Sequence, residues 1–599
     1  MRFKMLAAMA ILAIPCAAFA AQVSLHPGVN LFSGKLTTLE VVSAPADKGG
    51  PLPGVLLPSG AVLKADARLS RPYSIGRPFT VRGRTFTPVM LEAGVESLTV
   101  KSPVPPATAG DWPTFPKKLA IITNSYYPPQ LRNLTPFMNV KKADGWDVML
   151  VTEETWNPAN AKGQAAADAL RGWLKDNYLT EGIGYVLLAG NSDPNYGMVP
   201  MKMVWPLREL CDVTQDPVMC DIQNMPTDAY FSDLDGDWDL DNDGLYGEYP
   251  DDCGEGGVDL GPEVIVGRFP VLWDPTILDA YFGLATMYET ATDLKGRNRV
   301  LLPGAMLGFN GLSQGMENED GAPALNAMGG HLAQLDPNLV FTRMFEQEGY
   351  FKSKEPTDYP LSFEHLVNAF KYGHGLTIWY GHGYPTYVER MIWEDDSDGN
   401  RICEYNELAE KMMMDSFETS KFYDFGSQTM LWQISCMNAY PELEYNMAAM
   451  MLISNAAGTV AATRSALGEY APNLSWAPDP GLAASETLAY YWAEQLQKGM
   501  PIGEALAYVK ATIPSDGWDE AYPPSESYPS MMGLGYHSKF VYNLYGDPTL
   551  VWKYEAGAHD PDWPWADTDD DSSDDDSSAD DDSSSHDSGG HHHSGCSGS

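Results

Sequence analysis

The sequence has few basic residues. It holds 38 Lys and Arg against 81 Asp and Glu, a formal net charge of −43 over 599 residues. A chain this acidic lacks the positive surface that binds phosphate backbones, so we expect no nucleic-acid partner. Long apolar runs are also scarce. The longest, at residues 5–18, is shorter than the ~20 residues that a membrane helix needs, and we therefore expect no membrane span.

This early apolar run has the features of a secretory signal peptide. Arg2 and Lys4 precede it, and Ala18 and Ala20 form an A-x-A cleavage pattern. We therefore predict that residues 1–20 are removed and that the protein is secreted, to the extracellular space or the cell surface. A lipoprotein acylated at Cys16 is disfavoured, because Pro15 stands where a small residue is expected.

Cysteine is scarce, with seven in the chain. Cys16 leaves with the signal peptide and Cys596 lies in a polar tail. Pairing is expected among the others in an exported protein. The candidate disulfides are Cys211 with Cys220, which closes a short loop, and Cys253 with Cys403. This assignment leaves Cys436 unpaired, as a candidate reactive thiol.

Composition divides the mature chain into four parts. Residues 21–112 are rich in Val, Leu, Gly and Pro and predict a small β-rich leader, either a pro-domain removed on activation or a retained structural module. Residues 113–254 and 255–555 form two α/β subdomains. Residues 556–599 are rich in Asp and Ser and bury too little apolar surface to fold, so we expect a disordered acidic tail.

The two subdomains alternate strands with helices. Apolar strand patterns at 119–123, 147–151 and 185–190 enclose helical patterns at 131–143 and 165–177. This alternation predicts a parallel sheet with helices on both faces. Further strands are expected at 263–268, 300–306, 376–380, 430–434 and 458–462.

Two of these strands end in residues that can do chemistry. His382 follows the strand 376–380 between two glycines, and Cys436 follows 430–434. Functional groups of open parallel sheets gather at the carboxyl ends of strands. If the two strands are neighbours, the imidazole can take the thiol proton and stabilise the reactive thiolate. The backbone N–H groups of Gly383 and Cys436 would then receive the oxyanion of a tetrahedral intermediate.

These segments resemble those of a known peptidase family. The runs YGHG at 380–383 and ISCMN at 434–438 are similar to the catalytic histidine and cysteine segments of the gingipains. Three further segments agree in order, namely YVLLAG at 185–190, PEVIVGRF at 262–269 and NLYGDPTL at 543–550. The resemblance covers about residues 117–553.

The resemblance implies a fold and an activity. It implies a caspase-like α/β sheet in two subdomains, and a cysteine endopeptidase that acts through a Cys436–His382 dyad and a thioester acyl-enzyme on protein or peptide substrates. It also implies that Glu263 supports His382. Cleavage specificity does not transfer. Asp274 is a candidate partner for a basic substrate side chain, or simply the carboxylate that begins a helix at Pro275.

Acidic residues alternate along one loop. A carboxylate at every second position directs hard oxygen ligands towards one ion, and Gly244 permits a sharp turn, so we predict structural calcium and no organic cofactor. The proposed ligands are Asp233, Asp235, Asp237, Asp239, Asp241, Asp243 and Glu248. A second cluster, either a calcium site or a solvated loop, contains Glu394, Asp396, Asp398 and Glu404.

A function from another class uses the same features. A calcium-stabilised surface or adhesion protein can retain a peptidase scaffold without activity. Cys436 and His382 distinguish the two hypotheses, because a binding module needs no thiol and imidazole at two strand ends. The sequence does not determine the oligomeric state.

Overall fold

The computed structural model describes residues 21–25, 28–31, 36–41, 53–58, 62–65, 73–91, 97–101, 112–206, 224–254, 256–310, 318–422, 427–468, 483–515 and 533–555. The predicted signal peptide, the acidic tail and the Cys211–Cys220 pair lie outside these residues. Among the described residues, no helix combines the length and apolarity needed to cross a membrane.

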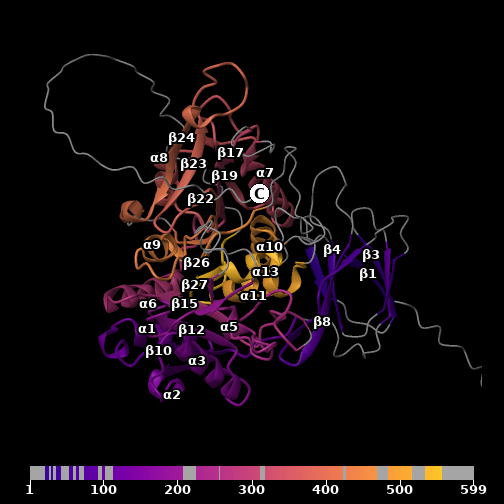
Figure 1. The fold of residues 1–599 in the computed structure, drawn as a ribbon, viewed down its shortest axis with the longest axis vertical. Helices are drawn as coiled ribbons and strands as arrows, with labels where there is room; N and C mark the ends of the chain where they lie inside the picture. Colours follow the sequence, from indigo (N-terminus) through magenta and orange to yellow (C-terminus); the bar gives the residue numbers. More distant parts are fainter. Residues whose placement is uncertain are drawn as a thin grey trace, which may run out of the picture.

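A central sheet of 11 strands organises the molecule (Figure 1). Its strands, in spatial order, are β11 (Asp147–Thr152), β10 (Lys118–Thr123), β12 (Tyr185–Gly190), β15 (Ile265–Pro270), β27 (Tyr542–Gly546), β26 (Ala456–Ala462), β25 (Thr429–Ile434), β21 (Leu376–Tyr380), β16 (Arg299–Gly304), β19 (Val340–Phe345) and β20 (Tyr359–Pro360). All neighbours are parallel except β26 and β27. The two halves of the sheet therefore run in opposite directions, and β15 and β27, from the predicted segment 255–555, lie in the same half as β10, β11 and β12.

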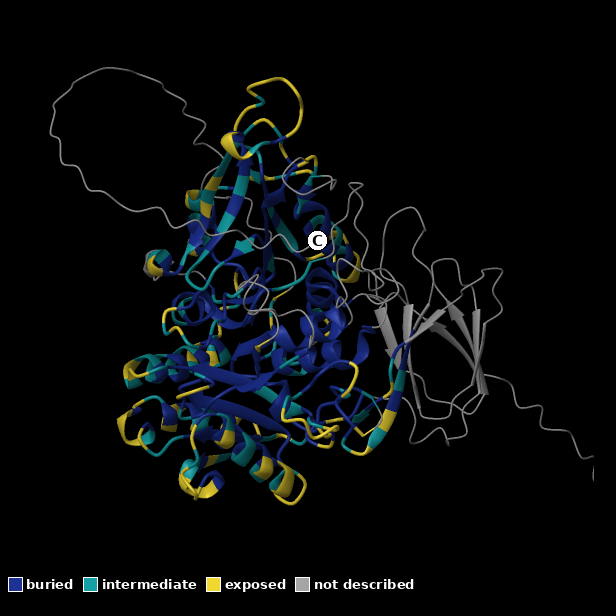
Figure 2. Cartoon of the chain, viewed as in Figure 1, coloured by how far each residue is buried: buried dark blue, intermediate teal, exposed yellow. Residues whose placement is uncertain are grey.

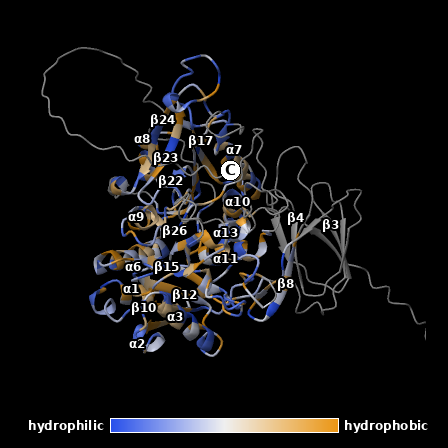
Figure 3. Ribbon diagram, in the orientation of Figure 1, coloured by the Kyte–Doolittle hydropathy of each residue, from blue (hydrophilic) through white to orange (hydrophobic). Residues whose placement is uncertain are grey.

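Helices cover the sheet. They are α1 (Leu134–Ala143), α2 (Glu153–Trp156), α3 (Gln164–Asn177), α5 (Ala229–Ser232), α6 (Pro275–Thr290), α7 (Ala322–Leu335), α8 (Phe363–Tyr372), α9 (Met447–Ser454), α10 (Ser485–Gln497), α11 (Ile502–Thr512) and α13 (Leu534–Val541). Every residue of β12 and β25 is buried, because helices shield both faces of a parallel sheet and its strands can be apolar throughout. Figures 2 and 3 show buried, hydrophobic strands at the centre and exposed, hydrophilic loops outside. The expected caspase-like α/β fold is confirmed.

Smaller sheets and short helices complete the described chain. The body adds the strand pairs β13 (Lys202–Val204) with β14 (Met225–Thr227) and β17 (Met306–Gly308) with β18 (Glu319–Asp320), and a three-stranded sheet of β22 (His382–Gly383), β23 (Tyr387–Trp393) and β24 (Leu408–Asp415). Its 3-10 helices are η2 (Pro128–Gln130), η3 (Tyr405–Glu407) and η4 (Ser416–Phe422). The leader consists of β1 (Ala21–Leu25), β2 (Gly28–Leu31), β3 (Leu36–Val41), β4 (Pro53–Pro58), β5 (Val62–Ala65), β6 (Tyr73–Ile75), β7 (Phe79–Val81), β8 (Arg84–Leu91) and β9 (Ser97–Lys101).

Two buried ion pairs explain conspicuous sequence segments. Arg268 of the GRF run donates to both oxygens of Asp228 at 2.8 and 2.6 Å. The ammonium of Lys141 lies 2.6 Å from Asp547 of the GDPTL run and 2.6 Å from Glu289. A buried charge is tolerated only with such partners. These ion pairs therefore join β15 to the start of α5, and the segment after β27 to α1 and α6.

The proposed second disulfide is wrong. Cys253 and Cys403 are both free, buried thiols, and they belong to different apolar clusters. Burial raises the pKa of Cys403 to about 11 and also raises that of Cys253. Both thiols are therefore held in the protonated, unreactive form.

Candidate active site

Cys436 lies in a tight turn directly after β25. The next residue, Met437, has a φ of 55°, a left-handed conformation that is uncommon outside glycine. Its N–H donates to the carbonyl of Arg464 at 2.9 Å, which holds the turn in place. A strained residue at a strand end is typical of functional sites, because the surrounding structure must maintain it.

His382 lies beside Cys436 because their strands are neighbours. Tyr380 of β21 pairs with Ile434 of β25, and each chain reaches its functional residue two positions later. Gly383 packs directly on the segment of Cys436, since an added Cβ would lie 2.1 Å from the carbonyl oxygen of Cys436 and 2.5 Å from its nitrogen. Only glycine allows this approach. The structure thus brings together the two residues singled out from the sequence.

A backbone carbonyl orients the imidazole. Nε2 of His382 lies 2.6 Å from the carbonyl oxygen of Leu307, which can only accept a hydrogen bond. Nε2 therefore carries the proton, and in the neutral ring Nδ1 is the nitrogen that can take one. Burial lowers the pKa of His382, opposed by the Leu307 carbonyl and by the charge of Glu410. A neutral histidine is the form that can act as a base.

The strand paired with His382 carries a carboxylate, that of Glu389. Glu389 is the register partner of His382 across β22 and β23. Burial and then repulsion from Glu410 raise the pKa of Glu389 to about 7. The charge of Glu389 itself therefore changes near neutral pH.

The sulfur of Cys436 contacts the segment after β26. Sγ accepts a hydrogen bond from the N–H of Ala466 at 3.3 Å and lies 3.7 Å from the carbonyl oxygen of the same residue. Cys436 is 9% exposed. An N–H group directed at the sulfur favours negative charge there.

Neighbouring polar side chains connect the segments of Cys436 and His382. Ser435 donates to Asn438 at 2.5 Å and accepts from the indole N–H of Trp379 at 3.2 Å. The Asn438 amide donates in turn to the carbonyl of Tyr384 at 2.7 Å. The Ser and Asn of the ISCMN run thus tie the cysteine turn to β21 and to the residues that follow His382.

Glu263 is placed elsewhere. It is fully buried, and its two carboxylate oxygens accept from the backbone N–H groups of Leu234 at 2.7 Å and Arg82 at 3.2 Å. Burial, followed by repulsion from Asp235 and Asp233, raises its pKa to about 9. These contacts join Glu263 to the acidic loop and the leader, whereas His382 is held by Leu307.

Five of the predicted calcium ligands fall into two groups, and Glu263, which was not predicted to be a ligand, completes the first group. One carboxylate oxygen each from Asp233, Asp235 and Glu263 lies within 4.8 Å of the others, and Asp239, Asp241 and Asp243 form a second such group. Asp237 and Glu248 belong to neither. Sets composed only of oxygen ligands suit calcium. In the other acidic loop, Asp396 and Asp398 gather with Glu407, which the sequence reasoning missed.

Two remaining candidates have structural roles. Asp274 is the N-cap of α6 and accepts from the N–H of Thr276 at 2.8 Å, the helix-start role considered from the sequence. His374, in the other His-Gly pair of this region, is buried and hydrogen-bonded to Ala369 and Thr342. Burial lowers its pKa to about 3.

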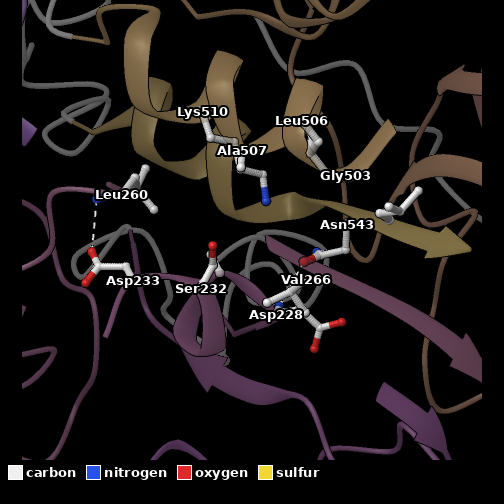
Figure 4. Close-up of a pocket in the computed structure, with 12 residues that line it drawn as sticks. Asp228, Ser232, Asp233, Leu260, Val266, Gly503, Leu506, Ala507, Lys510 and Asn543 are labelled. Carbon is white, nitrogen blue, oxygen red and sulfur yellow. Dashed lines mark hydrogen bonds between the residues drawn. The ribbon is translucent and has the colours of Figure 1, made fainter. Parts of the chain in front are cut away.

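A cavity of about 30 Å³ lies in another part of the body, between α11 and β15 (Figure 4). Lys510 projects into it from α11, and Asp228, Asp233 and Asn543 line it. None of the predicted catalytic residues lines this cavity.

Comparison with known proteins identifies the class. A model of Peptidase family C25 matches residues 113–553. Among solved structures, the Arg-specific cysteine proteinase gingipain R is 14% identical over 72% of this chain and 78% of its own, with a TM-score of 0.46. The complex of the pro- and mature domains of RgpB from Porphyromonas gingivalis is 14% identical over 72% of this chain and 79% of its own, with a TM-score of 0.46. No curated protein matches the chain.

The chain belongs to Peptidase family C25. Its class is that of the cysteine peptidases.

Sequence reasoning missed two contributors to the site. The Leu307 carbonyl and the Ala466 N–H are backbone groups, so their side chains carry no chemical signature. They come from segments 75 and 30 residues away from the groups they contact. Only the fold reveals them.

Proposed function

We propose that the protein is a secreted cysteine endopeptidase in which Cys436 is the nucleophile and His382 the general base and acid. The observation that carries the proposal is the contact of Gly383 with the Cys436 backbone, at adjoining ends of β21 and β25. Membership of the peptidase family supports it. The secretory signal in residues 1–20 supports export.

The chemistry follows from the protonation of the histidine. With its Nε2 proton held by Leu307, His382 accepts the thiol proton at Nδ1. The Cys436 thiolate attacks the peptide carbonyl, and the tetrahedral intermediate collapses to a thioester as His382 returns the proton to the leaving amine. Water, activated by the same histidine, then hydrolyses the thioester and regenerates the thiol.

The oxyanion formed during attack needs hydrogen-bond donors. We assign this role to the N–H groups of Gly383 and Cys436, whose backbones are in contact. One such donor typically contributes ~3 kcal/mol of transition-state stabilisation.

Calcium completes the proposal as a structural ion. The groups that would hold it are Asp233 with Asp235 and Glu263, and Asp239 with Asp241 and Asp243. Burial raises the pKa of Asp233 to about 6 and of Glu263 to about 9, so these carboxylates need a proton or a cation near neutral pH. Bound calcium would neutralise them and hold the acidic loop against α5 and β15.

A peptide-library cleavage assay tests the function. Wild type, Cys436→Ala and His382→Ala are compared as full-length and processed protein, with calcium and a mild reductant. Both variants should lose cleavage, and the double variant should be no worse than either single one, because the pair acts as a unit. His365→Ala, an exposed histidine on α8 that contacts Pro360, is the matched control and should cleave normally.

Two outcomes would contradict the proposal. Equal cleavage by wild type and Cys436→Ala would assign the chemistry to another group. No cleavage by wild type in either form would favour the inactive-scaffold hypothesis.

A further inference from the structure

The leader contains a hairpin with a well-defined turn. β7 and β8 are antiparallel, and Val81 pairs with Arg84 across a two-residue connection. Arg82 and Gly83 both have positive φ, 48° and 75°. Two successive positive φ values characterise the tight turn that matches the twist of a β-hairpin. The position of Arg82 in this turn is therefore set by the backbone.

The apolar face of this hairpin lies inside the core of the peptidase body. Phe79, Val81 and Phe86 are at most 2% exposed and belong to the same apolar cluster as the strands of the central sheet. Phe79 contacts Trp112, whose ring meets Tyr508 of α11 edge-on at 4.8 Å. An independent domain would bury such residues within itself. This hairpin buries them against the body.

Polar groups of the turn complete the contact. The Arg82 guanidinium donates to the carbonyl oxygens of Glu263 at 2.7 Å and Ile183 at 3.1 Å. The backbone N–H of Arg82 donates to the Glu263 carboxylate at 3.2 Å, and that of Thr80 to Asp259 at 2.7 Å. The buried carboxylates of Glu263 and Asp259 therefore depend on the hairpin for some of their hydrogen bonds, and an unsatisfied buried group is costly.

The backbones approach too closely for a loosely bound segment. An added Cβ at Gly261 would lie 1.7 Å from the carbonyl oxygen of Thr80. At the edge of the hairpin, Arg77 stacks on Tyr249 and donates to its hydroxyl at 2.8 Å. The hairpin therefore contacts the body through apolar side chains, through hydrogen bonds and through closely packed backbone.

We propose that residues 76–91 are a permanent structural part of the peptidase body. If the leader is processed, we expect one of two outcomes. Either the chain is cut before Gly76, or it is cut between residues 92 and 111 and the hairpin stays bound to the body. Figure 1 shows β8 well apart from β22, which contains His382, and from α9. The hairpin therefore stabilises the body from a side remote from Cys436, and it is not the part of the leader that could block the cleft.

Thermal unfolding of the full-length chain tests this assignment. Phe79→Ala removes a buried ring from the shared core and should lower the melting temperature of the main cooperative transition by about 5 °C. Thr85→Ala, an exposed position on the same hairpin, is the matched control and should leave the melting temperature unchanged. Because the readout is unfolding, a failure here is distinct from a failure of the proposed catalysis.

A cut chain provides the second measurement. A site-specific protease sequence replaces residues 107–109, the full-length protein is cut there, and the products are separated by gel filtration. We expect the leader fragment to elute with the body in native buffer and to separate only in denaturant, and Phe79→Ala to weaken the association. Dissociation of the wild-type fragment in native buffer, or an unchanged melting temperature in Phe79→Ala, would overturn the proposal.

Discussion

At the scale of single residues, the proposed site depends on a glycine as much as on Cys436 and His382. Gly383 has no room for a side chain, because a Cβ would lie 2.1 Å from the Cys436 carbonyl oxygen. A methyl group there must push apart the two segments that carry His382 and Cys436. A displacement of 1 Å can cost about 100-fold in rate.

Gly383→Ala should therefore lose at least about 100-fold in kcat/KM. The matched control is Gly330→Ala in α7, where an added Cβ meets no atom within 4 Å. This change should leave kcat/KM as it is and stabilise the helix by up to about 1 kcal/mol. Normal activity in Gly383→Ala would show that the close contact plays no part in catalysis.

The sequence predicted part of this site for a clear physical reason. Cys436 and His382 carry reactive side chains at strand ends, so composition and spacing identify them. The hydrogen bond of His382 to the Leu307 carbonyl could not be predicted from the sequence, because every residue has a backbone carbonyl. The support expected from Glu263 rested on family resemblance, and the contacts of that residue lie with Leu234 and Arg82.

At the scale of elements, apolar runs located the central strands closely. The predicted strand at 376–380 coincides with β21, and 430–434 differs from β25 by one residue. Strand order could not be predicted in the same way, because pairings such as β27 with β26 join segments about 80 residues apart. The sequence also could not predict that the hairpin β7–β8 packs in the core of the body, because its short apolar pattern fits a separate domain equally well.

The packing of α11 on β15 contains a buried amine. Burial lowers the pKa of Lys510 to about 7, against the opposing charge of Asp228. The pKa in the unfolded chain is about 10.4, so between these values the unfolded state binds the extra proton and stability rises with pH. Below about pH 7 the folded state carries the full cost of burying the charged Lys510 amine.

Lys510→Met should therefore raise the free energy of unfolding on the order of 4 kcal/mol at about pH 6, and by much less at about pH 10. Urea denaturation of wild type and variant at these two pH values measures the difference. Lys371→Met, at an exposed position on α8, serves as the control and should show no such pH dependence. A gain that is equal at both pH values would contradict the assigned pKa.

At the scale of the whole molecule, the net charge of −43 opposes folding through repulsion between carboxylates. The acidic loops place several of these carboxylates close together. Chelation of calcium should lower the melting temperature, and added calcium should restore it, because binding to the folded state alone stabilises it. Asp239→Asn and Asp241→Asn together should reduce this response, whereas Asp293→Asn, remote from both acidic groups, should not. An unchanged melting curve, with no metal found by elemental analysis, would remove calcium from the account.

The catalytic dyad is tested most directly by the rate at which iodoacetamide alkylates each cysteine of the full-length protein, followed by peptide mass spectrometry. Cys436 should react much faster than the buried Cys253 and Cys403, since only its thiolate is favoured by a histidine. In His382→Ala the rate at Cys436 should fall, while the rate at Cys596 in the tail stays the same and serves as an internal control. Slow labelling of Cys436 in wild type, or a rate that does not depend on His382, would contradict the assignment of the dyad.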